Sequence, residues 1–136
     1  RFVADFIGET NFINGTLTAR EGKRGIISVA DGDFNATLAD DALETGHPAT
    51  LAIRPERIAL RGLDSPDTPA DATQLDGQIE QAYYIGTDTR YIVRTFGGAA
   101  LTVRVQNTDY QHALTFKTGQ PVRVLWKREN ARILSD

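Results

Sequence analysis

The residues able to do acid–base, nucleophilic or metal chemistry are scattered along this sequence and form no motif. The two histidines, His47 and His112, each lack a second ligand at metal-binding spacing, so surface histidines are the simpler interpretation. No nucleophile-elbow context surrounds Ser28, Ser65 or Ser135. The glycines never reach the spacing of a phosphate-binding loop. The sequence therefore predicts a chain without catalytic residues and without a metal or cofactor of its own.

The composition narrows the function classes further. A formal net charge of −3 argues against a nucleic-acid-binding protein, which normally carries a basic face. The absence of cysteine excludes disulfides and thiolate zinc sites. No apolar run approaches the roughly 18 residues of a membrane span. Because the sequence starts at Arg1 without methionine, we expect a further part of the protein to precede it.

Four aromatic residues fall on neighbouring expected strands: Tyr83, Tyr84, Tyr91 and Phe96. Single-stranded nucleic acids stack on such residues, but a stacking surface also needs basic neighbours. The acidic balance of the chain therefore favours core packing and cross-strand pairing for all four.

Short runs with β-type alternation, separated by glycine and aspartate turns, dominate the sequence, and helix is scarce. About ten short strands at this spacing are typical of a barrel or sandwich. The expected strands are Phe12–Arg20, Gly25–Val29, Asp33–Leu38, Ala49–Ile53, Arg57–Arg61, Leu75–Ile85, Thr89–Phe96, Ala100–Val105, Pro121–Trp126 and Ala131–Leu134.

The strands fall into two similar halves, residues 12–62 and 75–136, joined by an exposed connector, residues 63–74. Each half closes on a glycine-x-proline followed by an apolar run, at Gly46 and at Gly119. We interpret the halves as a duplicated five-strand unit, which is the strand count of an OB-type barrel. The predicted fold class is all-β with OB-like barrel architecture.

The tripeptide Arg54-Pro55-Glu56 follows directly after an expected buried strand. Proline fixes the backbone there, and the two flanking side chains carry opposite charges. Two interpretations remain open: a salt-bridged corner, or a surface that contacts a partner.

Four segments in this order resemble the C-terminal region of polyamine-type ABC importer ATPase subunits. Phe2–Ile13 is similar to the junction that follows the nucleotide-binding domain of those subunits, and Ile53–Ile58 resembles the characteristic RPE segment. Gly77–Val105 and Gly119–Trp126 resemble the second half and the closing strand.

The resemblance implies a TOBE (transport-associated OB) domain over residues 12–136, with residues 1–11 as the tail of the linker from an ATPase domain. It implies a non-catalytic regulatory and dimerisation role in polyamine import, with ATP and Mg²⁺ bound outside this chain. The implied partners are a second copy, the chain's own ATPase domain and membrane permease subunits, on the cytoplasmic face of a bacterial membrane. The family's recurrent polar positions match Glu9, Asn11, Arg54 and Glu56, which are expected at an interface or corner.

Two alternative functions remain open. The chain could be a sensor that holds a small molecule or anion in a cleft between its barrels. It could also belong to the ATPase subunit of an iron or sugar importer, since those subunits are close relatives of the polyamine type.

Overall fold

The computed structural model describes residues 10–39, 42–63, 72–106 and 116–135. The chain divides into two compact units, which are considered one at a time. Unit 1 consists of residues 1–54 together with 127–136, and unit 2 consists of residues 55–126.

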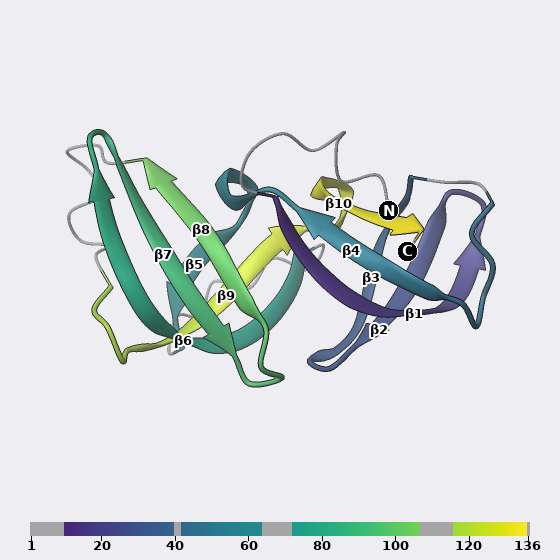
Figure 1. Ribbon diagram of the computed structural model, residues 1–136, viewed down its shortest axis with the longest axis horizontal. Helices are drawn as coiled ribbons and strands as arrows, with labels where there is room; N and C mark the ends of the chain where they lie inside the picture. The colour runs from purple at the N-terminus through teal and green to yellow at the C-terminus, as the bar shows by residue number, and fades with distance from the viewer. Residues whose placement is uncertain (1–9, 40–41, 64–71, 107–115, 136) are drawn as a thin grey trace. The chain divides into compact units, whose positions relative to one another are not determined.

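Unit 1 is a closed barrel of five strands (Figure 1) in the order β1-β2-β3-β10-β4. Its strands are β1 (Asn11–Glu21), β2 (Arg24–Val29), β3 (Gly32–Leu38), β4 (Pro48–Ile53) and β10 (Ala131–Ser135). The last strand, β10, pairs antiparallel with β4 and parallel with β3, and so closes the barrel. Side chains that are completely buried, including Leu17, Ile27 and Ile133, fill its interior.

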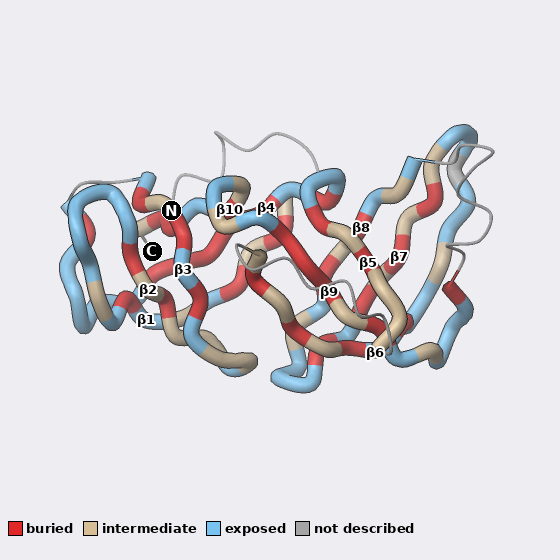
Figure 2. The backbone as a smooth tube through the Cα atoms, turned by 180° about the vertical axis from the view of Figure 1, so that it is seen from behind, coloured by how far each residue is buried: buried red, intermediate tan, exposed pale blue. Residues whose placement is uncertain are grey.

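Unit 2 is a five-stranded sheet in the order β5-β9-β6-β7-β8. Its strands are β5 (Ala59–Gly62), β6 (Ala72–Ile85), β7 (Asp88–Thr95), β8 (Ala100–Gln106) and β9 (Pro121–Lys127). Buried and more exposed positions alternate along β7 and β8 (Figure 2), as expected of strands with one face on a core. The buried face carries Ile79, Val93, Val103 and Val124, none of them more than 1% exposed.

Each unit contains a β-bulge that begins two residues after a glycine in the sequence. The register of β1 shifts between Leu17 and Ala19, and that of β6 between Ile79 and Gln81. A Cβ at Gly77, two residues before the second bulge, would stand 2.8 Å from the Arg94 carbonyl oxygen. Only glycine allows the neighbouring backbone to approach so closely.

The two glycine-x-proline turns also have matching geometry. Gly46 and Gly119 both have φ of +89°, a left-handed conformation that favours glycine. The amide of Gly46 donates to the Leu17 carbonyl at 2.6 Å, and the amide of Gly119 donates to the Ile79 carbonyl at 2.7 Å. Each turn thus ties the fourth strand of its half to the bulge of the first.

The all-β, OB-like fold class is confirmed, and most of the predicted strands lie within two residues of the observed ones. The largest boundary errors occur where β6 begins at Ala72, inside the expected connector 63–74, and where Pro55–Arg57 forms a 3₁₀ turn before β5. Residues 64–71 of that connector, and residues 1–9 of the expected tail, lie outside the described residues.

The compact units do not coincide with the sequence halves 12–62 and 75–136. Strand β5, the fifth strand of the first half, pairs with β9 in unit 2, whereas β10, the fifth strand of the second half, lies in unit 1. Apart from this exchange, corresponding strands occupy corresponding places in the two sheets. Alternation marks where a strand lies, but it does not specify which neighbour that strand pairs with, so the exchange could not be predicted from the pattern.

Candidate functional site

The predicted corner lies where the chain leaves unit 1 for unit 2. Arg54 follows the last residue of β4, and the 3₁₀ turn η2 (Pro55–Arg57) begins directly after it. Pro55 is buried, while Arg54 and Glu56 are both exposed. Neither charged side chain forms an ion pair with another residue in the described part of the chain. Within the described ranges no salt bridge forms at this corner, and the contact of Arg54 and Glu56 with a partner stays a prediction.

Asn11 is the first residue of β1 and is only 7% exposed. Its Cα partner on β4 is Ile53, so the structure brings Asn11 beside the strand end that precedes Arg54. The fourth predicted position, Glu9, lies outside the described residues.

A second corner of the same kind occurs where the chain returns to unit 1. The 3₁₀ turn η4 (Arg128–Asn130) follows β9 and precedes β10, and Glu129 is exposed like Glu56. The two halves of the sequence are therefore similar in local structure as well, since each has a 3₁₀ turn with an exposed glutamate before its last strand.

Sequence reasoning missed an ion-pair network on the outer face of unit 2. The Arg94 guanidinium donates to both Glu80 carboxylate oxygens, at 2.9 and 3.2 Å, and to the Gly98 carbonyl oxygen at 3.0 Å. These hydrogen bonds lower the pKa of Glu80 and raise that of Arg94. Glu80 is the extra residue of the β6 bulge, a position that alternation does not identify.

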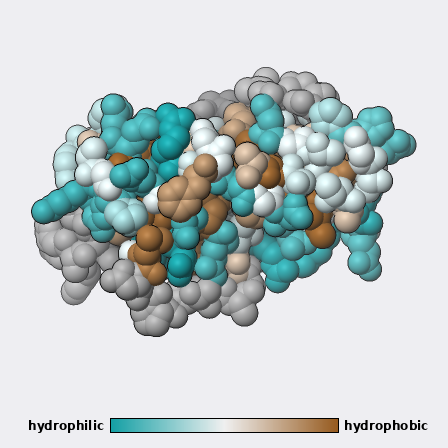
Figure 3. All heavy atoms as spheres, turned by 90° about the horizontal axis from the view of Figure 1, so that it is seen from below, coloured by the Kyte–Doolittle hydropathy of each residue, from teal (hydrophilic) through white to brown (hydrophobic). Residues whose placement is uncertain are grey.

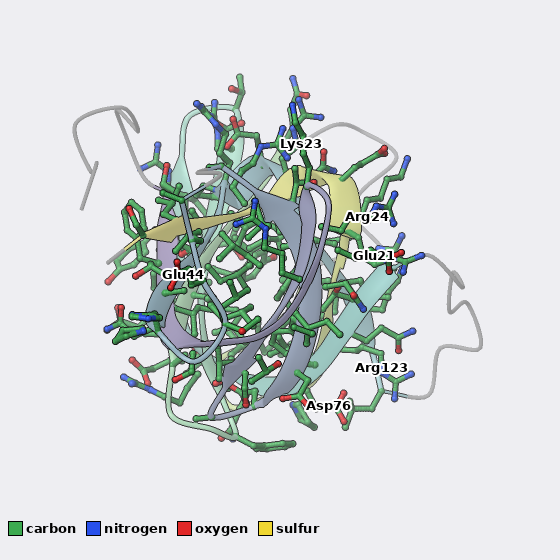
Figure 4. The ribbon with its side chains drawn as sticks, turned by 90° about the vertical axis from the view of Figure 1, so that its right-hand side faces the viewer. Glu21, Lys23, Arg24, Glu44, Asp76 and Arg123 are labelled. Atoms are coloured by element: carbon green, nitrogen blue, oxygen red, sulfur yellow. The ribbon has the colours of Figure 1, made fainter. Side chains whose placement is uncertain are left out.

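A further ion pair links β6 to β9 in the same unit (Figure 4). The Arg123 Nε lies 3.3 Å from the Asp76 Oδ1, and both side chains are partly exposed. Asp76 also accepts a backbone hydrogen bond from Phe96 through its carbonyl oxygen, at 3.4 Å. These contacts hold neighbouring parts of the sheet together. They do not direct several polar side chains toward a common ligand position.

The predicted core packing of the four aromatic residues is confirmed only for Tyr91. Its ring packs edge-on against Phe116 with centroids 5.8 Å apart, and its hydroxyl accepts the Phe116 amide at 3.3 Å. In contrast, Tyr83, Tyr84 and Phe96 are 47, 69 and 76% exposed. Tyr83 and Tyr84 are near the end of the β6–β7 hairpin, and Phe96 is in the β7–β8 turn.

Hydrophobic atoms also reach the surface elsewhere. On the face shown in Figure 3, they appear in several separate places among hydrophilic side chains. Isolated apolar residues of this kind are common on protein surfaces and do not define a site by themselves.

No group of three metal-ligating side chains occurs in the described ranges. His47 instead lies near the exposed Glu44, at 3.7 Å, and His112 falls outside the described residues. None of the helical segments described is long and apolar enough to cross a membrane.

A closed five-strand barrel joined to a second five-strand sheet of the same strand order defines an OB-like double domain. The family model described as "TOBE domain" matches residues 51–134, and the chain belongs to this family.

Named relatives align along the entire chain. The spermidine/putrescine import ATP-binding protein PotA of Roseobacter denitrificans is 37% identical over 139 aligned positions, which cover 100% of this chain and 36% of that protein. PotA 1 of Pseudomonas aeruginosa is 37% identical over 136 positions, covering 100% of this chain and 34% of that protein. The chain thus spans about a third of the length of the curated relatives that it matches.

A solved structure confirms the architecture. The cytoplasmic molybdate-binding protein ModG, with molybdate bound, superposes with a TM-score of 0.82 at 18% identity, covering 96% of this chain and 99% of that one. At this identity the likeness shows the fold alone.

Proposed function

We propose that this chain is the non-catalytic regulatory and dimerisation domain of the ATP-binding subunit of an ABC importer for spermidine and putrescine. The observation that carries the proposal is the 37% identity with polyamine import ATP-binding proteins along the entire chain. Membership of the TOBE family supports the same assignment. Because the chain corresponds to about a third of those relatives, we assign ATP, Mg²⁺ and hydrolysis to the part of the subunit outside it.

The architecture suits a scaffold that stays folded while attached parts move. Each unit contains one strand from the other half of the sequence, and unit 1 is complete only after the chain has passed through unit 2 and returned. A barrel closed by hydrogen bonds also has no free edge on which a foreign strand could pair. We place the domain on the cytoplasmic face of the membrane, held there by permease subunits that bind the ATP-binding subunit.

We assign the partner contacts to the corner residues Arg54 and Glu56. The resemblance to the family adds Asn11 and Glu9 to the same predicted set. Arg54 and Glu56 are exposed, and the burial of Pro55 between them fixes the backbone that carries both. A charged pair on a fixed corner can meet a complementary pair on a second copy or on the ATPase domain with little further loss of backbone freedom.

Uptake measurements test the transported substrate. Cells that lack the ATP-binding subunit are complemented with the subunit carrying this domain, and import of labelled spermidine, putrescine, ferric iron and maltose is measured. We expect polyamine import to return and the other two to stay at background. Restored iron or maltose import without polyamine import would reject the polyamine assignment.

The corner is tested in the purified subunit by light scattering and ATPase assays. The double variant Arg54→Ala/Glu56→Ala should weaken dimerisation and the ATP hydrolysis that depends on it, because exposed charges contribute to contacts rather than to folding. The control is Glu44→Ala, which removes an exposed acid of unit 1. Equal behaviour of the double variant and the control would remove these residues from the interface.

A further inference from the structure

Asn14 on β1 is the only asparagine of the sequence that is followed by glycine, and it is exposed. Asparagine is one of the chemically labile residue types. The main-chain nitrogen of the next residue can attack the asparagine Cγ atom, which closes a succinimide ring and releases ammonia. A glycine in the next position favours this reaction, because it has no Cβ to hinder the ring and its backbone rotates freely.

The fold requires the glycine of this pair. A Cβ on Gly15 would collide with the Ser28 carbonyl oxygen and would stand 2.7 Å from the Val29 Cγ1 atom. Only glycine permits such a close approach, which occurs two residues before the bulge of β1. Position 15 therefore keeps the residue that makes Asn14 reactive.

The β1–β4 ladder keeps the reacting groups of this pair apart. Gly15 is the Cα partner of Ala49 on β4. The Leu17 amide donates to the His47 carbonyl oxygen at 3.1 Å, and alternate amides of a strand point to the same side, so the Gly15 amide also points toward β4. Ring closure needs this amide to be free and needs Asn14 to leave the extended conformation. The reaction therefore proceeds when β1 separates from β4.

The Asn14 side chain depends on the same neighbouring strand. The Thr50 hydroxyl donates to the Asn14 Oδ1 atom at 3.2 Å, and Thr50 is completely buried. On the other side of β4, the Cα partner of Thr50 is Leu134 on β10, so β4 lies between β1 and β10 (Figure 1). Detachment of β10 thus loosens the strand that protects Asn14.

The corresponding pair of unit 2 carries a different first residue. Asp76 precedes Gly77, which lies two residues before the bulge of β6 as Gly15 lies two residues before that of β1. Aspartate side chains are ionised near neutral pH, and an ionised carboxylate resists nucleophilic attack. The Arg123 Nε also lies 3.3 Å from the Asp76 Oδ1. Of the two equivalent positions, the one in unit 1 carries the reactive amide.

We propose that Asn14 is a deamidation site whose modification records the opening of the unit 1 barrel. The Gly15 nitrogen bonds to the Asn14 Cγ atom, and its proton leaves with the side-chain nitrogen as ammonia. Water then adds to either carbonyl of the succinimide, which gives aspartate or isoaspartate at position 14. Both steps are acyl transfers that need only water. The inference does not depend on the proposed function.

The two products differ in their effect on the barrel. Aspartate leaves the main chain unchanged, and the Thr50 hydroxyl can donate to its carboxylate as it does to the Asn14 Oδ1. Isoaspartate routes the main chain through the side chain and so inserts a methylene group into β1. Strand β1 pairs with β4 through residues 11–16 and with β2 through residues 16–21, so this insertion shifts one ladder against the other. An opened barrel that acquires isoaspartate therefore cannot close in its original register.

The test is a time course of the purified 136-residue chain near neutral pH. Peptide mass spectrometry measures the conversion of each asparagine, and chromatography separates the aspartate and isoaspartate peptides. We expect slow conversion at Asn14 in the native chain and fast conversion in denaturant. At intermediate denaturant concentrations the rate should follow the open population of unit 1, measured by hydrogen exchange of β1 and β4. Asn35 and Asn130, which precede alanine, should convert far more slowly in denaturant than Asn14.

Matched variants connect the reaction to the barrel. Ile133→Ala removes a completely buried side chain of β10 and should raise the Asn14 rate roughly 30-fold, in step with the open population. Ile92→Ala, at a partly buried position of unit 2, should leave the rate near that of the parent.

Two variants at position 14 test the chemistry and its products. Asn14→Gln keeps an amide but needs a larger ring, so the conversion should disappear. Asn14→Asp should keep an unfolding midpoint close to that of the parent, whereas the isolated isoaspartate form should lose the amide protection of β1 and β4.

Four results overturn the proposal. They are a native rate equal to the rate in denaturant, a conversion that Asn14→Gln retains, a folded Ile133→Ala variant with the rate of the parent, and an isoaspartate form as well protected as the parent. If Ile133→Ala fails to fold, the denaturant series of the parent decides in its place, since a rate independent of the open population also contradicts the proposal.

Discussion

Replacing Ile133 by alanine should destabilise the barrel formed by β1–β4, although Ile133 is far from these strands in the sequence. Its side chain is completely buried. Its Cα partners are Leu51 on β4 and Leu38 on β3. A Cβ placed on Gly25 would stand 3.3 Å from the Ile133 Cδ1 atom and 3.1 Å from Leu38, so these side chains meet inside unit 1.

The expected loss is set by the cavity that alanine leaves. Truncating a fully buried isoleucine to alanine costs about 2–5 kcal/mol, and the upper part of that range applies where the surroundings cannot collapse. A closed barrel is such a place, because hydrogen bonds hold β10 to strands on both of its sides. A loss of about 2 kcal/mol corresponds to roughly a 30-fold rise in the open population.

Native-state hydrogen exchange measures where this loss falls. In Ile133→Ala, amides of β1, β2 and β4 should lose protection by roughly 30-fold or more, while amides of β6, β7 and β8 should change much less. Val124→Ala provides the mirror experiment, since Val124 is completely buried in unit 2. Ile92→Ala provides the surface control, since Ile92 is only partly buried on β7.

The reasoning fails if Ile133→Ala lowers protection mainly in β6–β8, or if β1–β4 keep their protection while β10 alone opens. Either outcome would mean that β10 is not an integral strand of the first barrel. A uniform loss over both units would show that they unfold as one cooperative body, which Val124→Ala should then reproduce.

Three further substitutions, the first with a matched control, are expected to separate packing from surface effects in denaturant unfolding. Gly77→Ala should destabilise by about 1–3 kcal/mol because its Cβ would press on a carbonyl oxygen, whereas Gly62→Ala, with open space around it, should stay within about 1 kcal/mol of the parent. Glu80→Gln should be less stable than the parent near neutral pH. The Arg94 hydrogen bonds lower the pKa of Glu80 in the folded state, so the ionised carboxylate stabilises the fold above about pH 4.5. The difference in stability between the parent and Glu80→Gln should therefore vanish as the pH falls through the lowered pKa of Glu80. Tyr91→Phe should cost about 1 kcal/mol, because it leaves a buried amide without its acceptor; an unchanged midpoint would contradict that hydrogen bond.

Local pattern was enough to predict the strands and the turns that join them. Alternation located β7 and β8 to within a residue, and the glycine-x-proline signals at Gly46 and Gly119 mark turns whose glycines have the same φ angle. These features depend on residues close in sequence, where backbone preference and burial act directly. The family and its fold could therefore be inferred before the tertiary structure.

Long-range pairing and exposure could not be predicted in the same way. Nothing in the residues around Ile133 shows that its neighbours are Leu38 and Leu51, because an apolar strand fits any complementary edge of a barrel. The exposure of Phe96 likewise depends on which side chains pack around the β7–β8 turn, which is a property of the assembled sheet. Of the predicted site residues, Arg54 and Glu56 have the exposure that an interface needs, while their role in one stays a prediction.

The position of β10 also sets an order of events during synthesis. A ribosome releases β1–β4 first, yet the strand that closes their barrel is made after all of unit 2. Until then the edges of β3 and β4 stay unpaired, and their apolar interior lacks Ile133. Such nascent edges attract chaperones and neighbouring chains, so the time taken to synthesise the chain from residue 55 to β10 sets the minimum period in which the first barrel is at risk of misassembly.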